Sequence, residues 1–231
     1  MEKFYKIAGL TVKMDTFGRA EEQAMPYGCE PCENPDITVV SNWPTKKGEY
    51  PELSDSDGEY LATGASFYKE LLNHGGLMLH SSAVVMDGRA YLFTADCGTG
   101  KSTHTGLWLK AFGDRAYILN DDKPALRLED GIWYAYGTPW SGKHDISVDA
   151  RVPLGGIALV TRSDTNRLEP LSGLEAVTQL LRQATRSNLM EYRAKLLELL
   201  DLLITGVPTW KLYCNMDVEA AHVAHRTMSA K

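Results

Sequence analysis

The segment ADCGTGKST, residues 95–103, contains the residue types that bind phosphate groups. It matches the phosphate-loop pattern G-x-x-x-x-G-K-[ST], except that Ala95 stands in place of the first glycine. Gly98 and Gly100 allow the backbone to curl with its N–H groups pointing inward, so that anionic oxygens can be bound without net protein charge. Lysine at the sixth position after Ala95 brings an ammonium to the β- and γ-phosphates, and the serine that follows is the usual protein ligand of magnesium. We therefore expect a nucleotide-binding loop made of Cys97, Gly98, Thr99, Gly100, Lys101, Ser102 and Thr103.

Two adjacent carboxylates follow this loop, twenty residues after its lysine. Asp121 and Asp122 stand directly after Ala116–Asn120, an apolar run that is typical of a strand. A carboxylate at a strand end beside a phosphate loop is the expected second protein contact of the magnesium. Because neighbouring side chains diverge there, one aspartate can reach the metal and the other the attacking nucleophile. The alternative is an ordinary turn with two solvated aspartates.

A third candidate segment is GTPWSGK, residues 137–143. Its glycines flank Ser141 and lead to Lys143, which favours a second small anion nest. We expect these two side chains to meet the acceptor or the transferred phosphoryl group, because a cation there would offset charge on the equatorial oxygens. The alternative is an ordinary Gly-Pro turn with a solvated lysine. Arg162 could supply a further cation, or it could lie on the surface.

Turn and helix signals indicate the elements that position these residues. Asp87-Gly88 predicts a hairpin between β-rich runs at 77–86 and 89–95, and Asp130-Gly131 predicts a second hairpin within 125–136. The loop lysine begins a predicted helix that runs to Phe112 and ends at Gly113. The apolar run Gly156–Thr161 is typical of a strand buried on both faces.

The remaining segments predict helices at the C-terminal end and strands at the N-terminal end. Ser172 and Glu175 form a capping box that opens a helix over 173–185. A second helix is predicted over 190–204, then a strand over 209–214 and a helix from Asp217. Short apolar runs at 6–12 and 37–40 predict strands joined by polar loops.

These elements predict an α/β fold: a mixed, antiparallel-rich sheet with flanking helices. We expect a single domain over residues 1–231. Residues 1–75 would be a strand-rich extension that adds strands to the core sheet, and residues 76–231 would form the nucleotide-binding core.

Composition narrows the classes of partner. The net charge of −6 argues against a protein that wraps nucleic acid, because affinity for phosphate chains comes from clustered Lys and Arg. No apolar run is long enough to span a membrane, so we expect no membrane partner and a cytoplasmic location. Cys29 and Cys32 form a lone C-x-x-C. Without further ligands at close spacing, it is interpreted as two loop thiols rather than a zinc site.

The stretch from His80 through the phosphate loop to the two aspartates resembles the catalytic domain of the bacterial HPr kinase/phosphorylase. It resembles the phosphoenolpyruvate carboxykinases more distantly. Both families share a compact loop ending S-G-x-G-K-[ST] and an Asp-Asp pair after the next strand, and Cys97 stands where that serine would be. His80 matches a histidine that the HPr kinase family has on the strand before the hairpin, although Ser81 follows where the family usually has glycine. The resemblance covers about residues 75–165.

The resemblance implies a P-loop kinase core of the HPr kinase/phosphoenolpyruvate carboxykinase type that uses ATP and Mg²⁺. It also implies that one aspartate takes the proton of an acceptor hydroxyl while the other helps to hold the magnesium. We favour Asp121 as the base and Asp122, with Ser102, as the metal ligands. His80 would tune or relay the proton, or else it is a core histidine satisfied by one backbone hydrogen bond.

The leading hypothesis is a magnesium-dependent kinase that transfers the γ-phosphoryl group of ATP to a hydroxyl of a peptide serine or a small molecule. One alternative is the reverse reaction on a phosphoserine, by a phosphorylase or phosphatase. Another is a nucleotide-binding regulatory module without catalysis. A decarboxylating carboxykinase is the least favoured. The glycine- and arginine-rich loops that grip the HPr protein in that family are not found, so we do not expect HPr as the substrate. A homo-oligomer is compatible with the sequence.

Overall fold

The computed structural model describes residues 3–184 and 189–230. Within them, nine strands form one mixed sheet. They are β4 (Gly76–Met78), β5 (Ser81–Met86), β6 (Arg89–Thr94), β7 (Ala116–Asn120), β8 (Ala125–Glu129), β9 (Ile132–Tyr136), β10 (Arg151–Arg162), β11 (Arg167–Pro170) and β12 (Thr209–Cys214). The order is β4-β8-β9-β10-β6-β5-β7, and β12 pairs with both β10 and β11. Neighbouring strands are antiparallel except where β10 runs parallel to β6 and β12, so the predicted mixed, antiparallel-rich sheet is confirmed.

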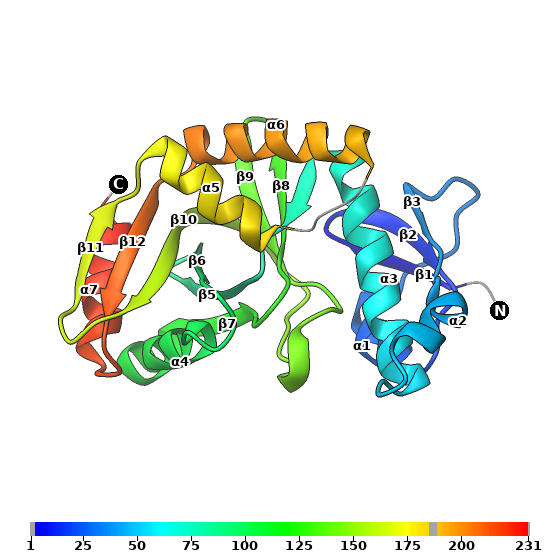
Figure 1. Ribbon diagram of the computed structural model, residues 1–231, viewed down its shortest axis with the longest axis horizontal. Helices are drawn as coiled ribbons and strands as arrows, with labels where there is room; N and C mark the ends of the chain where they lie inside the picture. The colour runs from blue at the N-terminus through cyan, green and yellow to red at the C-terminus, as the bar shows by residue number, and fades with distance from the viewer. Residues whose placement is uncertain (1–2, 185–188, 231) are drawn as a thin grey trace.

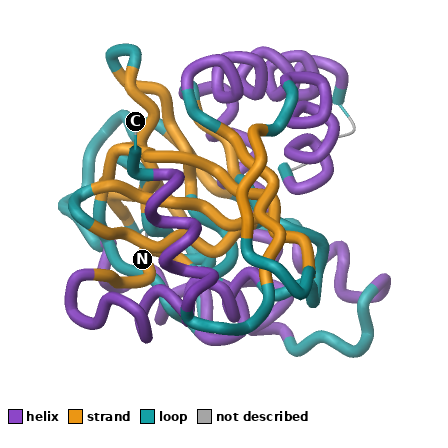
Figure 2. Tube along the Cα trace, turned by 90° about the vertical axis from the view of Figure 1, so that its left-hand side faces the viewer, coloured by secondary structure: helices purple, strands orange, loops and turns teal. Residues whose placement is uncertain are grey.

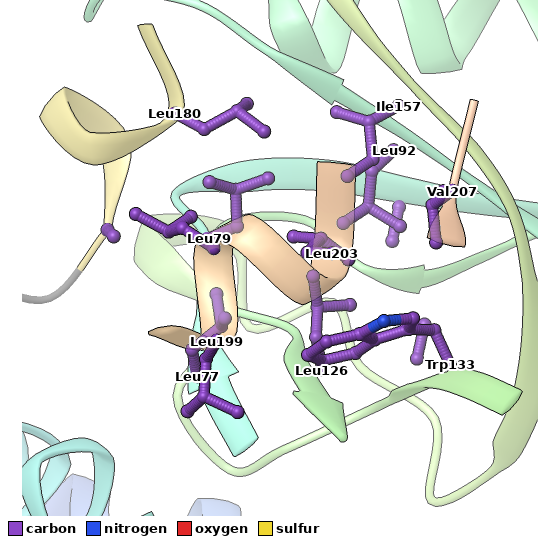
Figure 3. Close-up of a cluster of buried hydrophobic side chains, with 14 of the residues drawn as sticks. Leu77, Leu79, Leu92, Leu126, Trp133, Ile157, Leu180, Leu199, Leu203 and Val207 are labelled. Carbon is purple, nitrogen blue, oxygen red and sulfur yellow. The ribbon is translucent and has the colours of Figure 1, made fainter. Parts of the chain in front are cut away.

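Helices cover both faces of this sheet (Figures 1 and 2). On one face lie α5 (Gly173–Gln183) and α6 (Met190–Gly206), and on the other lie α4 (Lys101–Phe112) and α7 (Glu219–Met228). Successive residues of β5 alternate between the two cores, with Val85 packed toward α6 and Val84 toward α4. Figure 3 shows Leu203 of α6 beside Leu126 and Trp133 of the sheet.

The first strands of the chain form a separate sheet. The strands β1 (Phe4–Ile7), β2 (Leu10–Met14) and β3 (Ile37–Val39) are ordered β1-β2-β3. The expectation that residues 1–75 add strands to the core sheet is therefore wrong. The predicted strand over 6–12 is also wrong, because Ala8 and Gly9, at φ +51° and +75°, turn the chain into a hairpin between β1 and β2.

The N-terminal part also contains helices that the sequence reasoning missed: α1 (Gly18–Ala24), α2 (Trp43–Lys46) and α3 (Asp55–Leu71). The hydroxyl of Ser54 caps α3 by accepting the backbone N–H of Asp57 at 3.1 Å. The helix packs against α1 and β3 on one side and reaches β4 on the other. In Figure 1 these blue and cyan elements form the end of the molecule that carries the N-terminus.

Most of the remaining predicted elements are confirmed. Both predicted hairpin turns form, with Asp87 and Asp130 at positive φ ahead of their glycines. Ser172 accepts the backbone N–H of Glu175 and caps α5, which ends at Gln183; residue 185 of the predicted helix lies outside the described residues. The short 3₁₀ segments are η1 (Met25–Tyr27), η2 (Lys47–Glu49), η3 (Leu72–His74), η4 (Gly113–Arg115) and η5 (Gly142–His144). A search of the described helices finds none that combines the length and apolarity needed to cross a bilayer.

Candidate active site

The phosphate-loop segment lies between β6 and α4, as the sequence predicts. Gly98 and Gly100 have φ of +75° and +126°, conformations that residues with a Cβ rarely adopt. The first N–H groups of α4 have no partner within the helix, and the positive end of the helix dipole lies with them. Arg162 is exposed and braces the outside of the loop, since its Nε donates to the carbonyl oxygen of Thr99 at 3.0 Å. The segment therefore turns sharply at its glycines just before α4 begins.

Lys101 is the first residue of α4 and is only 8% exposed. Its Nζ donates to the carbonyl oxygen of Ala95 at 3.1 Å, across the loop. Burial lowers the pKa of Lys101, and the nearby carboxylates of Asp122 and Asp121 oppose that shift. Ser102 and Thr103 follow at the exposed start of the helix. An ammonium held over the loop and two hydroxyl groups are thus placed at the helix N-terminus.

Asp121 lies at the end of β7 and is 9% exposed. Its Oδ1 accepts the hydroxyl of Ser82 at 2.6 Å, and that hydroxyl also lies 2.7 Å from the hydroxyl of Thr105. Because Thr105 is one turn along α4 from Lys101, this buried network ties the carboxylate to the base of the phosphate loop. Asp121 is therefore not one of two solvated turn residues.

Asp122 is held from two sides by cationic or hydrogen-bonding groups. Its Oδ1 lies 3.0 Å from Nε2 of His80, and its Oδ2 pairs with the ammonium of Lys123. Burial by itself would raise the pKa of Asp122, but the hydrogen bond from His80 and the charge of Lys123 outweigh it and lower the pKa to about 2. The carboxylate is therefore anionic across the neutral range.

His80 lies between β4 and β5 rather than within a strand. Its backbone N–H donates to the carbonyl oxygen of Gln183 at 2.8 Å, and its carbonyl oxygen accepts the hydroxyl of Thr94 at 2.9 Å. Its side chain turns toward Asp122. The alternative of a core histidine satisfied by a single backbone bond does not describe this geometry.

The sequence reasoning gave Asn120 no role, yet this side chain builds the turn that carries the aspartates. It is fully buried, and its Oδ1 accepts the backbone N–H groups of Asp122 at 3.0 Å and Lys123 at 2.7 Å. Its amide nitrogen lies 3.2 Å from the carbonyl oxygen of Thr138 and 3.3 Å from the hydroxyl of Ser147. The signal available in the sequence was an asparagine directly before the aspartates, because Asn readily caps a turn through its side chain.

The 137–145 loop, which contains the predicted anion nest, is fixed from the N-terminal part of the chain. The hydroxyl oxygen of Tyr60 in α3 accepts the backbone N–H groups of Ser141 at 2.7 Å and Gly142 at 3.2 Å. The guanidinium of Arg19 stacks 4.1 Å from the centre of the Tyr60 ring, donates to the carbonyl oxygen of Gly142, and pairs with Asp145 at 2.7 Å. Gly142 lies against Asp122, because a Cβ on this glycine would come 2.8 Å from the Asp122 Cβ.

These segments enclose one cavity of about 490 Å³. It is lined by His80, Cys97, Gly98, Gly100, Lys101, Ser102, Thr103, Asp121, Asp122, Ser141, Gly142, Lys143 and His144. The structure thus brings together the predicted site residues from four separate segments, except Thr99, which lines two neighbouring cavities instead. The Oγ of Ser141 is buried without a hydrogen-bond partner, and Lys143 is exposed at the cavity.

The oxygen groups here suit magnesium better than a soft metal. Magnesium is usually held by one or two carboxylates plus the phosphates of a substrate, with several waters retained. The anionic Asp122 and the exposed hydroxyl of Ser102 line the same cavity and fit that pattern. Among residues 3–184 and 189–230, no group of three His, Cys, Asp or Glu side chains forms a closed metal site. Cys29 and Cys32 are free thiols between η1 and β3.

Comparisons with known proteins find only a distant structural likeness. No protein-family model matches the chain, and no curated protein matches it. Among solved structures, the chain is similar to the HPr(Ser) kinase/phosphatase from Coxiella burnetii, with 12% sequence identity and a TM-score of 0.37. The match covers 67% of this chain and 99% of that one. A likeness this distant assigns no activity to the chain.

Proposed function

We propose that the protein is a magnesium-dependent kinase that transfers the γ-phosphoryl group of ATP to a hydroxyl acceptor. One observation supports this most: a phosphate-type loop with its lysine, two carboxylates and a histidine all line the same cavity. A loop that only bound phosphate would need no buried carboxylate network beside it, because carboxylates repel phosphate unless a metal or a proton lies between them.

Residues 95–105 form the first wall of the cavity, and they would hold the phosphates of the donor. The backbone N–H groups at the start of α4 and the ammonium of Lys101 would bind their oxygens. Lys101 would exchange its present hydrogen bond to the Ala95 carbonyl for these phosphates. Asp122 and Ser102 would hold the magnesium, which when bound neutralises charge on the phosphate oxygens. The low pKa of Asp122 keeps the carboxylate ionised for this purpose.

Residues 120–122 and the 137–145 loop form the second wall of the cavity, and they would bind and activate the acceptor. Asp121 would accept the proton of the attacking hydroxyl, while the hydroxyl of Ser82 holds the carboxylate in place. His80 would orient Asp122. The unpartnered hydroxyl of Ser141 and the ammonium of Lys143 would meet the acceptor or the phosphoryl group in transfer.

The test is incubation of the protein with γ-labelled ATP, Mg²⁺ and a panel of peptides and small hydroxyl compounds. We expect the wild type to label an acceptor, Asp121→Asn to bind ATP without transfer, and Lys101→Ala to lose both. Parental transfer rates in both variants would contradict the assigned roles. Binding of ATP by the wild type without any transfer would favour a regulatory nucleotide-binding module, and release of phosphate from phosphoserine peptides would favour a phosphatase.

A further inference from the structure

Among the residues that the structure describes, we compare three cavities that meet at the phosphate loop. The first, described above, holds the aspartates. The second, of about 680 Å³, lies on the Cys97 side of the loop and has the cationic side chains of Arg162, Arg182 and Lys211 in its lining. The third, of about 760 Å³, lies between α4 and the carboxyl ends of β10 and β12.

The direction in which a bound triphosphate would run indicates that the nucleoside of the donor lies in the third cavity. This cavity and the aspartate cavity share Gly98, Gly100 and Thr103, so they meet across the start of α4. The second cavity shares only Cys97 and Gly98 with the aspartate cavity. A phosphate chain with its γ end at the aspartates and its other oxygens on the N-terminal amides of α4 therefore runs into the third cavity.

The lining of the third cavity suits the flat apolar faces of a nucleobase. Leu107 and Val160 are each 5% exposed and Cys214 is 7% exposed, so they form an apolar wall. Met216 is 76% exposed, and it lies at this cavity. Side chains with polarisable sulfur pack well on aromatic rings.

A second, independent observation is an unpaired buried donor. His104 is 2% exposed and lines this cavity. The indole N–H of Trp108 can only donate, and it donates to Nε2 of His104 at 3.2 Å. The neutral imidazole must then carry its proton on Nδ1, and this buried atom has no hydrogen-bond partner among the described residues. An unmade hydrogen bond of this kind is costly, and an acceptor atom on a ligand would satisfy it.

We propose that this third cavity binds the nucleoside of the phosphoryl donor. Its base would lie against Leu107, Val160 and Met216, and an acceptor atom of the nucleoside would face His104. This inference rests on the proposed function, because it assumes that the loop binds the donor's phosphates. It adds where on the protein the nucleoside of that donor would be recognised, between α4 and the carboxyl ends of β10 and β12.

The first experiment compares ATP with inorganic tripolyphosphate by calorimetric titration of the full chain in Mg²⁺. We expect ATP to bind at least about tenfold more tightly, because tripolyphosphate offers nothing to the apolar wall. Equal affinities would overturn the inference while leaving phosphate binding intact. If neither compound binds, the proposed function fails, and the inference falls with it.

Variants then locate the nucleoside. Leu107→Trp, at a residue that lines the third cavity and not the second, should fill the cavity, removing the advantage of ATP while tripolyphosphate still binds. Met216→Ser should weaken ATP binding about threefold without changing tripolyphosphate binding, because an exposed side chain contributes a small apolar contact. Met190→Ser is the matched control, since Met190 is also 76% exposed but lies on α6. Equal effects of the Met216 and Met190 changes would contradict the assignment.

Photolabelling with 8-azido-ATP tests the site without any substitution, so it decides the question even if Leu107→Trp fails to fold. We expect the label in peptides that contain residues 163–164 or 214–216, which line the third cavity and not the second, and excess tripolyphosphate should prevent it. Label confined to residues 179–182 or 211 would place the base in the second cavity and overturn the inference.

Discussion

The two walls of the aspartate cavity are built in different ways. The first wall, residues 95–105, is one continuous stretch whose shape follows from two glycines at positive φ and from the start of α4. The second wall combines residues 120–122 with the 137–145 loop, and it depends on Arg19 and Tyr60 in the N-terminal helices. Under the proposed function, binding of phosphate would therefore be a local property of this chain, whereas placement of the acceptor would depend on distant packing.

The largest effect is expected from Asn120→Ala, which breaks the second wall at its turn. The substitution leaves the half-buried backbone N–H groups of Asp122 and Lys123 without their acceptor, and each such loss costs about 1–3 kcal/mol. We expect the free energy of unfolding in urea to fall by about 4 kcal/mol. The exposed Asn73→Ala should change it by less than about 0.5 kcal/mol. A similarly small change in Asn120→Ala would show that the turn is stable without the Asn120 side chain.

His104, which is buried in the core beneath the first wall, should make the free energy of unfolding depend on pH. Burial lowers the pKa of His104 from 6.5 to about 4, so the folded state binds fewer protons than the unfolded state between these values. The neutral histidine's contribution is present above pH 6.5 and is lost as the pH falls to 4. We expect a loss of about 3 kcal/mol in urea unfolding over that range, reduced in His104→Gln. Parallel pH profiles for the two proteins would contradict a buried neutral histidine.

Gly100→Ala should damage the first wall without disturbing the second. A Cβ is strained at a φ of +126°, and relief of that strain would turn the loop's N–H groups away from the phosphates. We expect ATP affinity to fall about 100-fold by calorimetry, which corresponds to about 2.7 kcal/mol. Gly106→Ala is the matched control, because Gly106 lies inside α4 with open space where its Cβ would be, and alanine favours the helix. Equal ATP affinities in the two variants would sink the expectation.

Tyr60→Phe should give the smallest change and affect only the second wall. The loss of its hydroxyl leaves two N–H groups of the 137–145 loop without an acceptor, which we expect to cost about 2 kcal/mol of stability. The KM for the acceptor should rise while the affinity for ATP stays unchanged. Tyr50→Phe, at a tyrosine that is 46% exposed, is the control. A parallel loss of ATP affinity in Tyr60→Phe would mean that the two walls are not independent.

The same division explains how much the sequence could predict. The first wall and the two hairpins were predictable because glycine positions, turn pairs and a helix start act over a few residues. The second wall was predictable only in part: Asp121, Asp122, Ser141 and Lys143 were identified as candidates, but what holds them was not. Asn120, Tyr60 and Arg19 act through contacts that no short pattern encodes.

The N-terminal part was the least predictable region. Helix α3 contains two glycines, Gly58 and Gly64, and its first residues are polar, as in a loop. Both features concealed the helix in the sequence. Both glycines are there for packing, since a Cβ would come 2.1 Å from the ring of Trp43 at the first and 2.8 Å from that of Trp140 at the second. The capping pair Ser54 and Asp57 was the one local signal of a helix. The separate small sheet depends on β3 pairing with β2 across a long insertion, which periodicity does not reveal.

The proposed kinase activity depends most directly on a triphosphate being held at the start of α4. The decisive measurement is the melting temperature of the wild type and of Lys101→Ala with saturating ATP and Mg²⁺, with the exposed Lys110→Ala as the control. At a ligand concentration 100 times the dissociation constant, stabilisation is about 2.7 kcal/mol, or roughly 5–10 °C for a chain of this length. We predict that rise in the wild type and in Lys110→Ala and none in Lys101→Ala. An equal rise in all three proteins, or in none of them, would contradict the account.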